Sequence, residues 1–124
     1  MKRILTSLVL VVLFAMPVRA RAHEMSHHAT TTLTGEVVDT GCYLGHAARG
    51  TKHAECAAKC INGGMPMGLL TATGSLYLIT MNHDNPDAFN RLKAMAGKKV
   101  TVTGAPITRA GMRGIDVTSF KAAS

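Results

Sequence analysis

The chain has 124 residues, with 14 lysines and arginines against 7 acidic residues and a formal net charge of +7. Four of the basic residues lie within residues 1–22, so the rest of the chain carries a small and scattered positive surplus. The sequence has no tryptophan, 2 tyrosines and 3 phenylalanines. Nucleic-acid binding needs a basic face or aromatic platforms for bases, and this composition argues against that class of function.

The N-terminus has the pattern of an export signal. A positively charged start precedes an apolar run over residues 4–16, which is too short to span a bilayer comfortably. Small residues then fit signal-peptidase cleavage after Ala20 or Ala22. We therefore expect residues 1–22 to be a signal peptide and the mature protein to be periplasmic or secreted, with no membrane anchor after cleavage. The alternative is that the apolar run is retained as an anchor.

Residues 23–32 show no apolar periodicity and predict a flexible, histidine-rich tail. Cleavage after Ala20 would place His23 third, where the amine, two backbone amides and the imidazole suit Cu(II) or Ni(II). Cleavage after Ala22 would place His23 first, where its amine and imidazole can chelate one ion together. His23 is therefore a candidate additional metal ligand. The alternative is a solvated tail whose histidines occur by chance.

Residues 33–124 predict one mainly β domain. Segments that alternate apolar with polar residues, or that are rich in β-branched residues, predict strands over residues 34–39, 67–71, 75–81, 98–103 and 115–120. A short turn joins the second and third of these strands into a hairpin. We expect Asn85 to cap a helix over residues 86–96, which Gly97 ends.

The order of these elements predicts the fold. A turn at Pro106 and residues 111–114 separates the last two strands. An insert follows the first strand, and its alanine-rich second half predicts a helix over residues 52–62. Five short strands with a helix between the third and the fourth is the order of the OB-fold, a small partly open barrel. We therefore predict a five-stranded OB-fold-like barrel with a Cys/His-bearing helical insert after strand one.

All three cysteines and two of the six histidines lie in the insert. These candidate metal ligands are Cys42, His46, His53, Cys56 and Cys60. On a helix the last three stand at i, i+3 and i+7 and share one face. The first two are four residues apart and can reach that face from a tight turn or a second helical turn. Thiolate and imidazole are the preferred ligands of zinc and copper, so we expect a copper or zinc ion here.

Three residues outside the insert are possible additional ligands. Met65 and Met67 directly follow the predicted helix, and their thioethers suit Cu(I). His83 follows the third strand, whose end should lie at the same end of the sheet as the end of the first strand. The alternative for His83 is a plain position in the turn before the next helix.

The insert contains a distinctive pair of motifs. Residues 39–46 read D-x-x-C-Y-x-G-H, and residues 53–60 read H-x-x-C-x-x-x-C. Together with the strand patterns, these motifs resemble a group of small exported bacterial OB-fold-like proteins of unknown function. The resemblance covers about residues 33–121. It implies the OB-fold and the importance of the Cys/His cluster, and it implies no reaction.

The residues support three functions. The first is an exported metal-binding module for storage, sensing or delivery, whose partners are the metal ion and, for delivery, a periplasmic protein. The second is a disulfide-stapled OB-fold that binds another molecule, in which Cys42 pairs with Cys56 or Cys60 and one thiol stays free. The third is a thiol-dependent enzyme with Cys42 or Cys56 as nucleophile and His46 or His53 as base. The sequence carries no recognisable oxyanion or substrate signature for this enzyme.

Overall fold

The structure is a computed structural model that describes residues 29–124 and is mainly β. Its strands are β1 (Thr31–Asp39), β2 (Met67–Thr71), β3 (Leu76–Met81), β4 (Lys99–Arg109) and β5 (Met112–Ala122). Its helices are α1 (Thr40–His46), α2 (Ala54–Asn62) and α3 (Asp87–Leu92), with 3₁₀ turns η1 (Thr51–His53) and η2 (Lys93–Met95). The predicted signal peptide and the tail up to residue 28 lie outside the described residues. None of the helices in residues 29–124 is long and apolar enough to cross a membrane.

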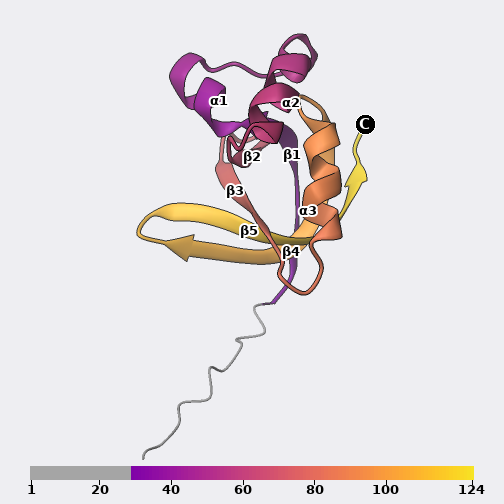
Figure 1. The fold of residues 1–124 in the computed structure, drawn as a ribbon. Helices are drawn as coiled ribbons and strands as arrows, with labels where there is room; N and C mark the ends of the chain where they lie inside the picture. Colours follow the sequence, from indigo (N-terminus) through magenta and orange to yellow (C-terminus); the bar gives the residue numbers. More distant parts are fainter. Residues whose placement is uncertain (1–28) are drawn as a thin grey trace, which may run out of the picture.

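The five strands form one mixed sheet whose pairings close into a ring. The order is β1-β2-β3-β5-β4, and β4 pairs back with β1. β3 and β5 run parallel, and every other neighbouring pair is antiparallel. Figure 1 shows α1 and α2 together at one end of the ring and the β4–β5 hairpin projecting to one side. The predicted five strands, with a helix between the third and the fourth, are confirmed.

The core lies inside the ring and beneath the helices. Fully buried side chains come from alternate positions of the strands, as expected for a pleated sheet with one inner face: Val37, Leu69, Val100, Val102, Ile115 and Val117. α2 contributes Ala57 and Ile61, and α3 contributes Ala88 and Leu92. Each helical pair is spaced i, i+4, so each helix presents one apolar stripe to the sheet.

The last two strands are longer than the alternating pattern predicts. Each has 11 residues, so the predicted turn is wrong at Pro106 and at residues 112–114, which lie in strands, and right at Gly111. Pro106 lies within β4 and pairs with Ile115, while the turn consists of Ala110 and Gly111, both with positive φ. Among the described residues, β4 pairs with β1 only up to Gly104. Proline is tolerated beyond that point because that part of β4 is an edge.

Two smaller predictions also differ from the structure. β1 begins at Thr31, so the last two residues of the predicted tail belong to the sheet. Asn85 does not cap α3: its side-chain amide donates to the Thr118 carbonyl at 3.1 Å. The side chain of Asn82 instead accepts from the backbone amides of residues 84 and 85 and shapes the turn before the helix.

Candidate metal centre

The first half of the insert is a short helix that begins directly at the end of β1. Asp39, the last residue of β1, is fully buried, and its Oδ1 accepts a hydrogen bond from the Cys42 amide at 2.7 Å. This is an N-cap bond, and it fixes Cys42 in the first turn of α1. The helix ends at Ala47, whose left-handed backbone lets its amide donate to the Tyr43 carbonyl at 2.8 Å.

The second half of the insert is also held by an acidic residue of β1. The Gly50 amide donates to the Glu36 carboxylate, and Gly50 has a φ of 81°, which favours glycine. The chain then enters η1 and α2, and His53 stands at their junction. The His53 Nε2 lies 3.2 Å from the Asp39 Oδ2. Glu36 and Asp39, both in β1, therefore anchor the two halves of the insert to the rigid sheet.

These anchors bring the cysteines together around Cys42. The ligand atoms of Cys42, His53 and Cys56 all lie within 4.8 Å of one another. Those of Asp39, Cys42 and Cys60 satisfy the same limit. The two groups share Cys42, so its thiol lies beside an imidazole and a second thiol in one group and beside a carboxylate and a third thiol in the other. All three cysteines are free; Cys42 and Cys60 are half-buried, while Cys56 is exposed.

The carboxylate and the thiols shift one another's pKa values. Burial raises the pKa of Asp39, but the hydrogen bonds from the Cys42 amide and from His53 outweigh it and hold that pKa below 3.8. The hydrogen bond with Asp39, together with burial, raises the pKa of the Cys42 thiol to about 12. Burial and the neighbouring Cys56 raise the pKa of the Cys60 thiol. Deprotonation of Cys42 and Cys60 is therefore disfavoured, and a cation bound between these groups would stabilise the thiolates.

The structure brings some of the predicted insert ligands into the two groups and leaves one outside them. Cys42, His53, Cys56 and Cys60 lie in the two groups, whereas His46 is exposed in the last turn of α1 and belongs to neither. Thus four of the five predicted insert ligands lie in one or the other of the two groups.

The predicted ligands outside the insert are also separated from one another. His83 is exposed in the turn after β3 and lies in neither group. Met67 is buried in the core, with 1 % of its surface exposed. Met65 is partly exposed, and its thioether packs over Gly41, where an added Cβ would meet the sulfur at 2.8 Å. His23 lies outside the described residues.

Asp39 is the site residue that the sequence reasoning missed. The sequence pattern places Asp39 at the end of the first strand and in the D-x-x-C motif, and it predicts no separate role for this residue. A signal for that role was present: an aspartate three residues before a cysteine, at the end of a strand, fits an N-cap whose side chain lies over the first helical turn.

Comparison with protein-family models found no match, and comparison with curated proteins found none either. The geometry of the centre therefore carries the functional argument.

Proposed function

We propose that this protein is an exported module that binds a thiophilic metal ion, Cu(I) or Zn(II), for storage, sensing or delivery. The single observation that carries the proposal is that Cys42 is common to two groups of ligand atoms. Soft thiolates and an imidazole in one small volume suit both ions better than hard cations such as Ca²⁺ or Mg²⁺. The export signal and the periplasmic or secreted location belong to this proposal.

A closed zinc site would take its ligands from both groups. Cys42, His53 and Cys56, with Cys60 from the second group, would supply the four N and S ligands that a structural zinc ion takes. A His53 that donates its Nε2 hydrogen to Asp39 keeps the Nδ1 lone pair for the metal. Asp39 would then orient the imidazole from behind, as carboxylates commonly do for metal-bound histidines. For Cu(I), the three thiolates alone form a sufficient set.

The fold supports placing ligands in this insert. The closed ring of five strands, with α3 between β3 and β4, suits an OB-fold, and we include that assignment in the proposal. The insert joins β1 to β2, one of the connections that such barrels use to bind ligands. A loop anchored to a rigid sheet by Glu36 and Asp39 can hold its ligands ready for a metal ion.

The same residues also bear on the thiol-dependent enzyme and on the disulfide-stapled domain. A nucleophilic cysteine needs a lowered pKa, and Asp39 raises that of Cys42 to about 12, which argues against an enzyme that uses Cys42. The disulfide-stapled domain stays as a second candidate, because the sulfurs of Cys42 and Cys60 lie within 4.8 Å. Oxidation of that pair would remove two ligands and leave Cys56 free.

The test is metal binding by the reduced, metal-free mature protein. Zn(II) and Cu(I) are titrated in competition with a chromophoric chelator, and bound metal and free thiols are counted. We expect one ion per chain. Cys42→Ser should weaken binding by about 100-fold or more, because it removes the shared ligand, and Asp39→Asn by about 10- to 100-fold, because it releases the imidazole.

Matched histidine variants give the control. His53→Ala should weaken binding, while His46→Ala, in the same insert but in neither group, should leave it unchanged. Replacement of His27 and His28, which lie in the predicted tail over residues 23–32, should also have no effect. Equal losses in His46→Ala and His53→Ala, or an unchanged affinity in Cys42→Ser, would refute the site. Tight binding that depends on the tail histidines alone would place the metal in the tail.

A further inference from the structure

A second feature lies on the other side of α1, where two strands of the ring diverge. The parallel pairing of β3 with β5 begins at Leu78 with Gly114 and runs on from there. Before that point, within the described residues, Leu76 and Tyr77 pair only with β2. The corresponding start of β5, residues 112–113, pairs only with β4. Two strand edges therefore face one opening, and each lacks a partner on that side.

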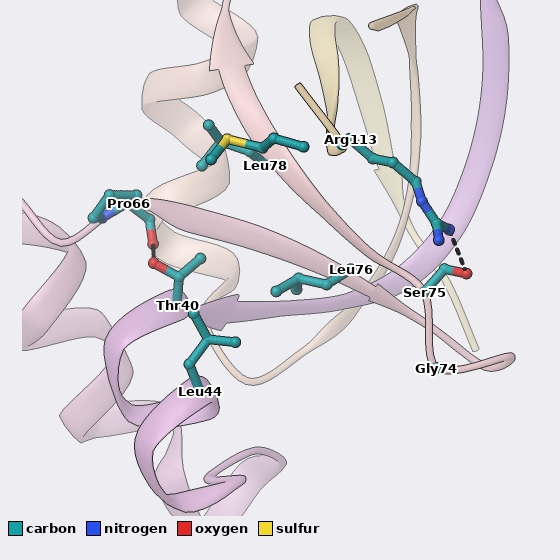
Figure 2. A pocket seen from close by; sticks show the side chains of 10 residues that line it. Thr40, Leu44, Pro66, Gly74, Ser75, Leu76, Leu78 and Arg113 are labelled. Atoms are coloured by element: carbon teal, nitrogen blue, oxygen red, sulfur yellow. Dashed lines mark hydrogen bonds between the residues drawn. The ribbon is translucent and has the colours of Figure 1, made fainter. Parts of the chain in front are cut away.

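A cavity of about 540 Å³ occupies this opening. Its walls come from α1, from the β2–β3 hairpin and from the β4–β5 hairpin, and Figure 2 shows Leu44, Leu76 and Leu78 around it. Leu44 on α1 is 74 % exposed and Met112 on the β4–β5 hairpin is 63 % exposed, the highest values for large apolar side chains among the described residues. Exposed apolar side chains that line one groove indicate a binding surface.

Arg113 is the one charged side chain among the described residues that line this groove. Its Nη1 donates to the Ser75 hydroxyl at 3.0 Å, across the opening between the two hairpins (Figure 2). Its guanidinium also lies 5.9 Å from the centre of the Tyr77 ring. These contacts hold the guanidinium at the opening, while its other N–H groups can bind a carboxylate.

We propose that this groove binds an extended polypeptide segment of a partner protein. The segment adds as a strand in the fork between β3 and β5, places alternate apolar side chains against Leu44 and Met112, and pairs an Asp or Glu with Arg113. The unpaired edges supply backbone donors and acceptors that a strand can use and an alkyl chain cannot. The apolar walls and the single positioned guanidinium predict a partner segment that is extended, mostly apolar and acidic at one position.

The groove and the metal centre lie on different faces of one helix. Thr40 and Leu44, spaced i, i+4 on α1, line the groove, and the Thr40 hydroxyl donates to the Pro66 carbonyl at 3.0 Å. Cys42 lies between them in sequence and belongs to the metal centre. The inference therefore does not require that the centre binds metal, and its test is run with and without Zn(II).

The experiment selects peptides from a displayed random library against the immobilised mature protein. A Leu44→Gln variant serves for counter-selection, and circular dichroism confirms that each variant is folded. Enriched peptides are synthesised and their affinities are measured by fluorescence anisotropy. We expect alternating apolar positions with an Asp or Glu. Arg113→Gln should weaken binding by about tenfold or more, because it removes a charge-assisted bond. Lys121→Gln is the matched control in the same strand, β5, and should have no effect, since Lys121 is exposed near the end of that strand and does not line this groove.

Methylation of backbone amides tests strand addition. Methyl groups on alternate amides should abolish binding in one register, where the amides face the protein, and be tolerated in the other. Tolerance in both registers would overturn the proposal, as would peptides that bind Arg113→Gln as well as the wild type. No enrichment over Leu44→Gln would also overturn it. Sodium laurate that binds in an Arg113-dependent manner, with no peptide selected, would assign the groove to small apolar acids instead.

Discussion

Asp39 offers the sharpest test of how the metal centre is built. Its buried carboxylate makes two bonds that the structure resolves separately, one from the Cys42 amide and one with His53. Asp39→Ala removes both bonds. Asp39→Asn keeps an oxygen acceptor for the Cys42 amide and removes the charge that holds His53.

The magnitudes follow from these two bonds. Loss of an N-cap residue costs about 1 kcal/mol, and loss of a partly buried hydrogen bond to a charged group costs about 1.5 kcal/mol. Asp39→Ala should therefore lower the free energy of unfolding by about 2.5 kcal/mol, and Asp39→Asn by about half as much. For a domain of this size, the larger loss lowers Tm by about 10–20 °C.

The assay is urea unfolding of the reduced, metal-free protein, followed by circular dichroism. Asp84→Ala, an exposed aspartate in the turn before α3, is the control and should change the stability by less than about 0.5 kcal/mol. Because the pKa of Asp39 lies below 3.8 in the folded protein, its stabilising effect is complete above that value. The effect is lost as the pH falls through the folded pKa, so the gap between wild type and Asp39→Asn should narrow on acidification.

Two results would refute this reasoning. If Asp39→Ala costs no more than Asp84→Ala, the carboxylate neither caps α1 nor holds His53 to any measurable extent. If Asp39→Asn costs as much as Asp39→Ala, the cap contributes nothing on its own and the division into two bonds is wrong.

Further predictions concern the thiol and two glycines. Titration of thiolate absorbance should give Cys42 a pKa of about 12, and Asp39→Asn should lower that pKa. Because the pKa is raised above 9.0 in the folded protein, the free energy of unfolding should fall as the pH rises from 9.0 toward 12. Gly104→Ala should destabilise the domain by about 3 kcal/mol, since the new Cβ would lie 2.2 Å from the Asp116 carbonyl oxygen, and an unchanged urea midpoint would contradict this. Gly45→Ala should instead raise the stability by about 0.5–1 kcal/mol, because Gly45 lies inside α1 with open space around it, and a loss in the same assay would contradict that.

The local sequence pattern was sufficient to predict most of the strands and helices. β2 spans the predicted residues 67–71, and η1 with α2 covers the helix predicted over residues 52–62. The helical spacing of His53 and Cys56 also indicated that they would lie in one group. These features depend on residues a few positions apart, and their side-chain periodicity is visible in the sequence itself.

The remaining features depend on residues that are distant in the sequence. Pro106 could be placed in a strand only once the partners of β4 were known, since proline is tolerated where β1 has ended. The role of Asp39 required His53 to fold back over the end of β1, 14 residues later in the chain. The parallel pairing of β3 with β5, and the point at which it stops, determine where Arg113 meets Ser75. The sequence by itself determined the approximate positions of the five strands and of the helices over residues 52–62 and 86–96, and which side chains are candidate metal ligands. Only the tertiary structure decided which of these side chains meet, because closure of the ring joins segments whose proximity no local pattern records.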